Sequence, residues 1–486
     1  MTQSSAVILW FRNDLRLHDN PALTAAIETG QPIIAVYILE EFAGNPWPMG
    51  GASKWWLVEA LKSLQQDLLF YHLPLILRKG DPLTILKDLA QQSNAGRVFW
   101  TRRYDPFLIE QDKIIKNTLN ELGIRADSYK GALLHEPWAI RNSQGQPFRV
   151  FTPYWKAIRH LPIAEECPKP TSMTPYQGSL SSDDLNAWPL QAHWAEKMQK
   201  HWTFGEKAVQ QRWKDFCRNN LKDYPNMRDR PDFAATSKLS PYLHWGQISP
   251  RQIWHDIHKI AVDHPELENG KESFLRELAW REFNHHLLFY SPGLPSKAWH
   301  QEFDAIKWQN DETILKIWQQ GKTGYPLIDA GMKELWQTGW MHNRVRMIVA
   351  SFLVKNLQIS WVQGERWFWD TLVDGDLAQN AANWQWVAGC GADAAPYFRV
   401  FNPVLQARKF DPDGSYVRRW LPQLGKLPKE YIFEPYGAPP DILKKAGIEL
   451  GKNYPYPIVD LKQSRASALD LYRTIVSARS TTDKNM

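Results

Sequence analysis

The sequence predicts a protein in two parts, an α/β domain built on a doubly wound parallel sheet and then an all-helical domain. Apolar segments typical of buried strands alternate with helical periodicity over the first 130 or so residues. Strand signals almost vanish after about residue 200, and residues 160–200 are rich in Pro, Ser and Asp without any period. We therefore expect an α/β domain over 1–131, an interdomain linker over 132–200 and a helical domain over 201–486.

The strands and helices of the first part follow one another in regular order. We expect strands at AVILWF, PIIAVYIL, LPLILRKG, RVFWTRR and RADSYKG, with helices over 53–71, from Pro82 and over 107–122. The first helix begins at Pro21, with Asn20 as its N-cap and Gly30 closing it. Such a sheet binds ligands at the carboxyl ends of its strands. The first strand is not followed by a GxGxxG motif, so a cofactor would be held in another way.

Helical periodicity dominates the second part of the chain. The predicted helices cover 205–220, 248–262, 271–290, 311–320, 328–339, 341–356 and 364–371, and the tail SARSTTDKNM looks frayed.

Composition is that of a folded soluble protein and excludes several classes. Of the 486 residues, 43% are hydrophobic and 23% charged, and the net charge of +6 is compatible with a polyanionic partner. No apolar run reaches the roughly 18 residues of a membrane helix, and the N-terminus lacks the features of a signal peptide. The three cysteines are far apart, which favours a reducing compartment, and they cannot supply a four-cysteine iron–sulfur or zinc site.

Tryptophan is unusually abundant, with 25 residues that crowd into the second half of the chain. Many of them must form an aromatic core. Packing alone is a costly reason to use tryptophan, because its N–H needs a partner when it is buried.

The octapeptide WMHNRVRM mixes polar and aromatic residues on one predicted helical face. Read as a helix, it places Trp340, Asn343, Arg344 and Met347 at i, i+3, i+4 and i+7. An apolar core stripe would not carry an amide and a guanidinium, and a solvated stripe would not carry an indole.

A second helix, ELAWREFNHH, repeats the mixture. Glu277, Trp280, Arg281 and Asn284 share one face at the same spacing. An interhelical salt bridge would explain Glu277 or Arg281 alone. Two such helices in one domain indicate a cavity lined by polar and aromatic groups.

Two further segments carry groups suited to binding. TSKLSP, at 236–241, offers hydroxyls and a lysine beside a helix start, which suits a phosphate, although a plain helix cap also explains it. In DGDLAQNAANWQW, Asp374 and Asp376 flank Gly375 without the further ligands of a calcium loop. We expect these carboxylates near Arg344 and Arg346, with Asp374 also able to accept hydrogen bonds from a heterocycle or sugar.

Basic residues interleaved with aromatic ones follow towards the C-terminus. Cations bind phosphates and flat rings stack on exposed bases, so this pattern suits nucleic acid, with a solvated face as the alternative. The residues are Arg399, Arg408, Lys409, Arg418 and Arg419.

Long motifs through nearly the whole chain resemble the photolyase/cryptochrome family of flavoproteins. They are LWFRNDLRLHDNPAL, TSKLSP, ELAWREF, TGYPLIDAGM, TGWMHNRVRM, DGDLAQNAANWQW and YFRVFNPVLQARKF. Within the family, the chain most resembles a cyclobutane pyrimidine dimer DNA photolyase of the class I/III type. The resemblance implies an α/β antenna-binding domain, a wrapping linker and a helical domain that holds FAD.

The resemblance also assigns cofactor residues. Asn380 would lie opposite flavin N5, Arg346 would pair with Asp374 beside the ring, and an amide at 380 would favour a fully reduced anionic flavin. The implied FAD-binding set is Tyr224, Thr236, Ser237, Lys238, Leu239, Ser240, Arg281, Arg346, Asp374, Gly375, Asp376 and Asn380, and no metal is implied.

The substrate implied is DNA containing a pyrimidine dimer that is flipped into a cavity. The lesion pocket would comprise Glu277, Trp280, Asn343, Met347 and Trp386, and the residues contacting the DNA strand would be Arg228, Arg344, Arg399 and Gln406. Photoexcited reduced FAD would donate one electron to the dimer, which splits and returns it. Asn343, where (6-4) photolyases typically have a second histidine, favours cyclobutane dimers.

Electron transfer and light harvesting complete the implied function. Trp384, Trp361 and Trp308 match the family's hopping chain from flavin to surface. GGASKWWLVEAL resembles the branch that tends to carry methenyltetrahydrofolate as antenna, with 8-hydroxy-deazaflavin or no antenna as alternatives. We expect a cytoplasmic monomer, associated with the nucleoid if bacterial. A cryptochrome-type blue-light receptor without repair is the alternative, disfavoured by Asn380, Asn343 and the short tail.

Overall fold

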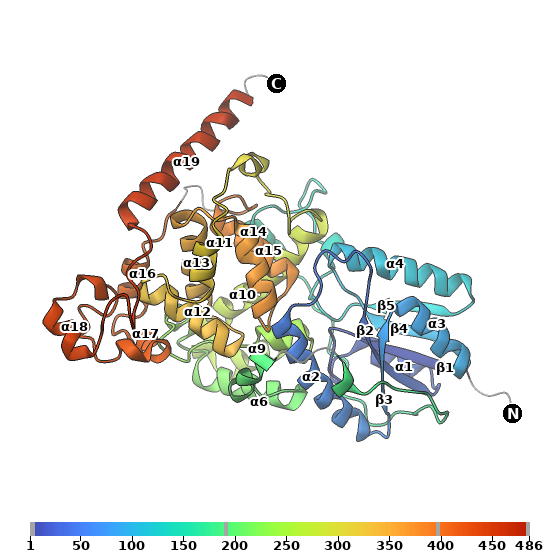
Figure 1. Ribbon diagram of the computed structural model, residues 1–486. Helices are drawn as coiled ribbons and strands as arrows, with labels where there is room; N and C mark the ends of the chain where they lie inside the picture. Colours follow the sequence, from blue (N-terminus) through green and yellow to red (C-terminus); the bar gives the residue numbers. More distant parts are fainter. Residues whose placement is uncertain (1–4, 189–192, 395–398, 483–486) are drawn as a thin grey trace. The chain divides into compact units, whose positions relative to one another are not determined.

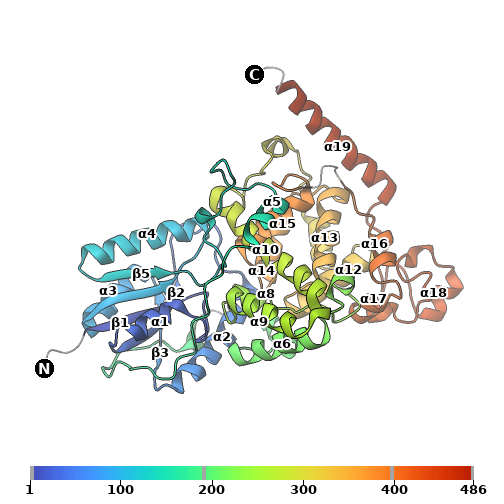
Figure 2. The same cartoon turned by 180° about the vertical axis from the view of Figure 1, so that it is seen from behind.

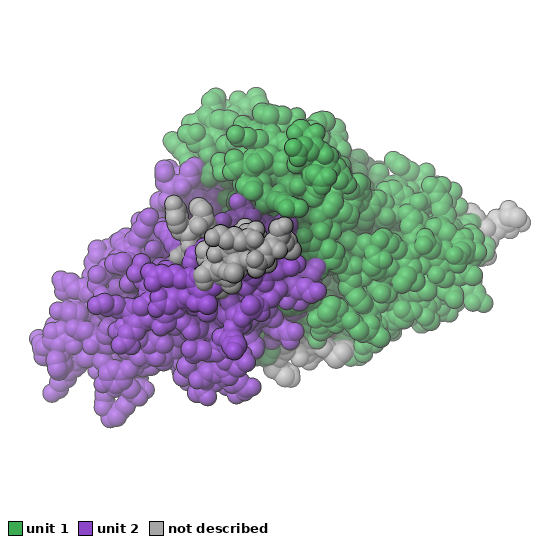
Figure 3. Space-filling model, turned by 90° about the horizontal axis from the view of Figure 1, so that it is seen from above, with its two compact units in different colours: residues 1–222, 237–292 green, residues 223–236, 293–486 purple. Residues whose placement is uncertain are grey.

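The chain folds into two compact units. The computed structural model describes residues 5–188, 193–394 and 399–482, with side chains up to Thr474 in the last helix. Unit 1 comprises Met1–Lys222 and Ser237–Pro292, and unit 2 comprises Asp223–Thr236 and Gly293–Met486 (Figure 3). Each unit is described by itself.

Unit 1 contains a five-stranded sheet in which every neighbouring pair of strands is parallel (Figures 1 and 2). Its order is β3-β2-β1-β4-β5, so the chain moves outward to one edge and then returns to the other. The strands are β1 (Ala6–Phe11), β2 (Ile33–Glu40), β3 (Leu75–Gly80), β4 (Ala95–Thr101) and β5 (Arg125–Tyr129). The predicted doubly wound parallel sheet is confirmed.

The helices between the strands are α1 (Pro21–Glu28), α2 (Gly51–Leu69), α3 (Pro82–Ser93) and α4 (Pro106–Glu121). Asn20 caps α1 as predicted, because its side chain accepts a hydrogen bond from the Leu23 N–H at 3.1 Å. Apolar residues of α3 and α4 share one cluster with alternate strand residues, which is how a parallel sheet buries its face. The cluster includes Ile8, Trp10, Val36, Leu86, Leu89, Val98, Trp100, Ile115 and Leu119.

Part of the predicted linker runs along the sheet as an extended segment, whereas α5 (Phe151–Ile158) is a helix within it. Ile33 at the start of β2 donates to Thr174 at 2.7 Å and accepts from Tyr176 at 3.0 Å. Farther along, Asp183 donates to Leu77 of β3 at 2.8 Å. These backbone hydrogen bonds fix the path of this aperiodic segment along β2 and β3.

Several helices after the linker also belong to unit 1. They are α6 (Glu206–Asn219), α8 (Ser240–His244), α9 (Pro250–Asp263) and α10 (Glu268–Tyr290). Asp19, fully buried beyond β1, binds Arg251 and Ser249 at the start of α9 and accepts from the Cys167 N–H at 3.0 Å. A buried charge requires such partners, so this cluster joins the loop after β1 to the helices.

The described part of unit 2 consists of helices and loops. Its helices are α7 (Tyr224–Met227), α11 (Glu312–Gln319), α12 (Pro326–Thr338), α13 (Asn343–Ser351), a π-helix (Phe352–Asn356), α14 (Trp361–Thr371), α15 (Leu377–Ala388), α16 (Pro403–Phe410), α17 (Ser415–Trp420), α18 (Pro440–Ala446) and α19 (Leu461–Thr482). The helical prediction for this part is confirmed. The last helix continues into the segment that looked frayed in the sequence.

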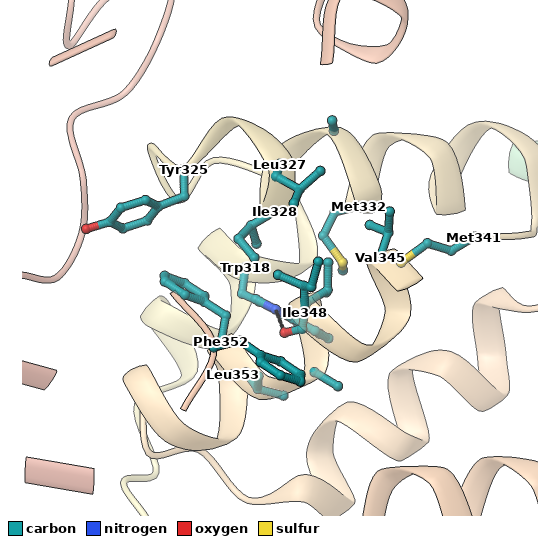
Figure 4. Packing of buried hydrophobic residues seen from close by; sticks show 14 of the residues in the cluster. Trp318, Tyr325, Leu327, Ile328, Met332, Met341, Val345, Ile348, Phe352 and Leu353 are labelled. Atoms are coloured by element: carbon teal, nitrogen blue, oxygen red, sulfur yellow. Dashed lines mark hydrogen bonds between the residues drawn. The ribbon is translucent and has the colours of Figure 1, made fainter. Parts of the chain in front are cut away.

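Trp318 lies at the centre of the unit 2 core (Figure 4). Its ring is fully buried, and its indole N–H donates to the Val349 carbonyl at 3.2 Å. Figure 4 shows Ile328, Met332 and Ile348 among the side chains around it. Part of the tryptophan abundance therefore serves packing, with the polar N–H satisfied inside the core.

Within the described residues, no helix is long and apolar enough to span a membrane.

Gly246 is predicted to be far more sensitive to a methyl group than Gly447. Both have positive φ, 66° and 72°, but a Cβ at Gly246 would lie 2.1 Å from the Asn13 carbonyl oxygen, whereas nothing lies within 4 Å at Gly447. Gly447→Ala should cost about 1–2 kcal/mol for the left-handed conformation. Gly246→Ala should cost about 1–3 kcal/mol more, from overpacking. Urea unfolding followed by circular dichroism measures both, and equal losses would show that the Asn13 segment yields freely.

Candidate functional site

The helix that contains most of the octapeptide WMHNRVRM begins at Asn343. His342 is its N-cap and accepts from the Arg344 N–H at 3.2 Å. Trp340 therefore precedes the helix, and its predicted place on the same helical face is wrong. It is buried instead, and its carbonyl accepts from the Thr338 hydroxyl at 2.9 Å. The mixed face of α13 that remains carries the exposed Asn343 and the half-buried Arg344 and Met347.

Arg344 is held by three contacts inside unit 2. It forms an ion pair with Asp229 at 2.6 Å, lies over the Phe410 ring at 4.6 Å and has Nη1 3.7 Å from the Met347 sulfur. We expected Arg344 to lie near the Asp374 and Asp376 carboxylates. Its ion pair is with Asp229 instead. Asp229 has this role because α7 and the loop after it belong to the same unit.

The predicted ion pair between Arg346 and Asp374 is present. Arg346 Nη2 lies 2.8 Å from Oδ2 and 3.2 Å from Oδ1 of Asp374, and Arg346 Nε donates to the Met341 carbonyl at 2.7 Å. The Asp374 side chain is only 3% exposed, whereas that of Arg346 is 23% exposed. The pair therefore has one buried and one partly accessible end.

Asp376 and Asn380 lie on the first turns of α15. Asp376 caps the helix by accepting from the Gln379 N–H at 2.9 Å. One turn later, the Asn380 Nδ2 donates to the Glu365 backbone carbonyl at 2.9 Å. Since a carbonyl can only accept, this bond fixes the amide orientation and leaves Oδ1 available as an acceptor, together with the second amide N–H.

Glu365 on α14 is a buried acid that the sequence analysis missed. It is fully buried, and neither of its carboxyl oxygens has a hydrogen-bond partner among the described residues. Burial raises the pKa of Glu365 well above its ordinary value, which favours the neutral acid. A signal was readable, because Trp361, Glu365 and Phe368 share the core face of a helix at i, i+4 and i+7.

The three tryptophans of the predicted hopping chain all lie in unit 2, on or against one apolar cluster. Trp384 and Trp361 are buried, whereas Trp308 is partly exposed. The Trp384 ring lies so close to α14 that a Cβ on Gly364 would fall 2.1 Å from it. Trp386, two residues on from Trp384, is half-buried against the same cluster.

Unit 1 contributes the second mixed face, on α10. Glu277, Trp280 and Arg281 are half-buried there and Asn284 is buried, in the order expected from the sequence. The Trp280 ring stacks on Phe151 with centroids 3.8 Å apart and planes 8° apart. Arg281 Nη1 donates to the Ala132 carbonyl at 2.8 Å.

The predicted phosphate segment is divided between the units. Thr236 ends the first stretch of unit 2 and Ser237 begins the second stretch of unit 1. Lys238 has a left-handed backbone with φ of 52°, and the Ser237 hydroxyl accepts from the Leu239 N–H at 3.4 Å before α8 begins at Ser240. In unit 2, Tyr224 is buried with the Arg228 guanidinium 5.6 Å from its ring.

Basic residues near the C-terminus have mixed surroundings. Arg399 is exposed and lies over Phe401 at 5.1 Å, and Gln406 is half-buried on α16. Arg408 is paired with Glu434, and Arg418 donates to the Leu427 carbonyl at 2.9 Å. Residues 395–398, at the start of the YFRVFNPVLQARKF motif, lie outside the described part of the chain.

The carboxyl ends of the strands hold a network of charged groups in unit 1. Asp112 lies 2.7 Å from Arg12 and 3.1 Å from Arg103, which also pairs with Glu40 at 2.6 Å. The buried indole N–H groups of Trp10 and Trp100, and Nε of Arg12 and Arg103, have no hydrogen-bond partner among the described residues. This is the edge at which a doubly wound sheet binds ligands.

Among all residues that the structure describes, no group of His, Cys, Asp and Glu could hold a metal ion.

Comparisons with known proteins agree with the two-part fold. A model of the FAD binding domain of DNA photolyase matches residues 274–474, and a DNA photolyase model matches residues 7–172. The deoxyribodipyrimidine photo-lyase of Agrobacterium fabrum is 48% identical over 97% of this chain and 98% of its own length. That of Escherichia coli is 37% identical over 96% and 98%, and Arabidopsis thaliana cryptochrome-1 is 37% identical over 94% and 69%.

Solved structures give the same result. A bacterial class III photolyase from Agrobacterium tumefaciens superposes with a TM-score of 0.95 at 48% identity, covering 98% of this chain and 99% of that one. A cryptochrome from Synechocystis superposes with a TM-score of 0.88 at 31% identity, covering 97% and 100%. The fold and the matched domains define a flavin-binding protein with an α/β and a helical part. The chain belongs to the photolyase/cryptochrome family.

Asp374→Asn is predicted to weaken both unit 2 and its hold on the cofactor. Losing a charge-assisted hydrogen bond to Arg346 should cost about 1.5–3 kcal/mol of unfolding free energy and lower the FAD content of the purified protein. The matched control is Asp413→Asn, whose ion pair with Lys429 at 2.6 Å is exposed on both sides. The control should cost at most about 1 kcal/mol and retain FAD. Similar losses in both variants would contradict a special role for the buried pair.

Proposed function

We propose that this protein is a deoxyribodipyrimidine photo-lyase, a carbon–carbon lyase that splits cyclobutane pyrimidine dimers in DNA by light-driven electron transfer from reduced FAD. The observation that carries the proposal is similarity over nearly the whole chain to proteins named deoxyribodipyrimidine photo-lyase, at 48% and 37% identity. Trp384, Asn380 and the Arg346–Asp374 pair, within one helical unit, support the same conclusion.

The residues of unit 2 fit a flavin. Asp374 is already neutralised by Arg346 and keeps acceptor capacity, and Asn380 keeps its carbonyl oxygen as an acceptor because its amide nitrogen is bonded to Glu365. An acceptor at that position can hold an N–H group but cannot deliver a proton. The full proposed set is Tyr224, Thr236, Ser237, Lys238, Leu239, Ser240, Arg281, Arg346, Asp374, Gly375, Asp376 and Asn380. When bound, FAD absorbs the light and supplies the electron, and the chain orients it and excludes water.

The lesion would be held by groups of complementary chemistry. A dimer can reach a buried flavin only after leaving the base stack, so the enzyme needs flat walls and hydrogen-bonding groups for its edge. We assign the walls to Trp280 and Trp386, and the polar contacts to Glu277 and Asn343. Met347 supplies an adaptable apolar surface. Phe151 stacks on one face of Trp280, which holds this wall rigid.

DNA affinity would come from cations around that pocket. Arg228, Arg344, Arg399 and Gln406 are the proposed contacts to the strand. Arg344 is oriented by Asp229 and Phe410 before DNA arrives, which reduces the entropy lost on binding. The net charge of +6 favours encounter with a polyanion.

A blue-light receptor without repair is the second candidate, favoured by the similarity to Arabidopsis thaliana cryptochrome-1. Illuminating the fully reduced protein with dimer-containing oligothymidylate separates the two candidates. Repair restores the thymine absorbance, and no recovery at all would contradict the photolyase proposal.

We propose methenyltetrahydrofolate as antenna, with 8-hydroxy-deazaflavin or none as alternatives; the unpartnered donors around Trp10 and Arg12 suit a polar chromophore. A solved photolyase from Sulfolobus tokodaii is described with two FAD molecules, with the implication of a novel light-harvesting cofactor. We also propose a monomer that acts on DNA in the cytoplasm, at the nucleoid in a bacterium, with domains at 1–131, 132–200 and 201–486.

Glu277→Ala should lower the repaired fraction per absorbed photon roughly tenfold, because about 1.4 kcal/mol of stabilisation of the lesion is lost. FAD content should not change. The control is Glu268→Ala, on the same helix with a side chain 60% exposed, which should repair normally. Repair at the wild-type level by the Glu277 variant would remove this residue from the site.

Trp308→Phe should slow photoreduction of the protein and leave repair by chemically reduced protein intact, because only the outer end of the electron relay is lost. Absorbance under continuous illumination measures the first effect, and the oligothymidylate assay measures the second. Trp336→Phe is the control, since Trp336 is a surface tryptophan of the same unit that has no part in the relay. Loss of both activities together in the Trp308 variant would argue against the assignment.

A further inference from the structure

Lys355 is a buried lysine in the core of unit 2. It lies in the π-helix Phe352–Asn356, which continues α13, and it is only 5% exposed. Its ammonium Nζ lies 2.6 Å from the backbone carbonyl of Arg399, to which it donates. Lysine is seldom buried this deeply, and π-helical turns are frequent at functional sites.

Lys355 shares a small pocket with Trp308, the proposed outer end of the electron relay. The pocket has room for about one water molecule. Residues from the segment before α11, the π-helix, α15 and α19 enclose it: Ile306, Trp308, Val354, Lys355, Gln358, Ala388, Ala468 and Leu471. Apart from Lys355 and Gln358 its lining is apolar or aromatic, so a proton in this pocket has few places to go.

The pKa of Lys355 is lowered to about 7, mainly by burial and in smaller part by the nearby Arg399 charge. Burial also raises the pKa of the Cys390 thiol, which therefore stays neutral. Other charged groups lie on the neighbouring segments. They are Glu302 and Asp304 before Trp308, Arg366 on α14, and Lys462, Arg465, Asp470 and Arg473 on α19. Near pH 7 a large share of Lys355 is thus in the neutral amine form, which can accept a proton.

We propose that the amine of Lys355 accepts the indole proton of Trp308 when Trp308 is oxidised, and so makes the charge separation last. This inference rests on the proposed electron relay. Trp308 gives one electron to oxidised Trp361 and becomes a radical cation. Its N–H bond then breaks, the proton passes through the small pocket to the Lys355 amine, and a neutral Trp308 radical and an ammonium remain.

The proton transfer has a direct consequence for the relay. An electron returning to a neutral indole radical must be accompanied by the returning proton, whereas return to a radical cation needs no proton. Lys355 would therefore slow charge recombination without touching flavin or DNA. Below pH 7 Lys355 already carries its proton and cannot take another.

Transient absorption after a laser flash tests the proposal, because the tryptophan radical cation and the neutral radical have different spectra. In the wild-type protein, the rate of deprotonation should rise about tenfold from pH 6 to pH 8, following the fraction of Lys355 in the amine form. Lys355→Met and Lys355→Arg should deprotonate Trp308 more slowly at pH 8 and without this pH dependence. Lys307→Met, an exposed lysine beside Trp308, should behave like the wild type.

The possible outcomes distinguish a failure of the Lys355 role from a failure of the electron relay. A Trp308 radical that forms normally and deprotonates identically in all four proteins would overturn the role of Lys355 and leave the relay intact. No radical at Trp308 in the wild-type protein would overturn the relay and, with it, this inference.

A measurement in the dark checks the state of Lys355 in the folded protein. A lysine whose folded pKa lies below its unfolded value of about 10.4 binds more protons when unfolded, so the wild type should lose stability as pH falls from about 10 to about 7. Lys355→Met, of similar length, lacks this group. Its stability relative to the wild type should therefore increase over the same interval in urea unfolding. A constant difference between the two proteins would show that Lys355 stays charged, and would overturn the proposal.

Discussion

The contact between α14 and α15 is the constraint on which the candidate site depends. The Asn380 amide is bonded to the Glu365 carbonyl, and the Trp384 ring lies where a side chain at residue 364 would be. Glycine at 364 is what allows this approach, because any Cβ would displace the ring. One helix pair therefore fixes both the amide proposed to face the flavin and the first tryptophan of the proposed relay.

Unit 2 also buries ionisable groups, at a cost in stability. Glu365 and Lys355 are almost completely buried, and burial shifts both pKa values towards the neutral form. Apolar residues of similar volume would pack in these places without that cost. For Lys355, the proposed role as a proton acceptor beside the proposed relay gives a reason to retain such a group.

Neighbouring residues hold the polar and aromatic side chains of the two mixed helical faces in place. On α13, Asp229 and Phe410 hold Arg344 in place, and the Arg346–Asp374 pair anchors the next turn. On α10, Phe151 covers one face of Trp280. Within each unit, these contacts hold in place side chains that we assign to the proposed lesion pocket and DNA contacts.

The sequence by itself determined the parallel sheet, the Asn20 cap, most long helices and the family, because periodicity, capping and long motifs are local. The Arg346–Asp374 pair, 28 residues apart, was predicted only through the resemblance to the family. Only the tertiary structure decided that α13 starts after Trp340, that Asp229 binds Arg344, and that Glu365 and Lys355 are buried. It also placed four helices after the linker with the sheet, through Asp19 and Arg251. Burial and long-range pairing depend on segments far apart in the chain. A local pattern does not show which distant residue will contact a given side chain.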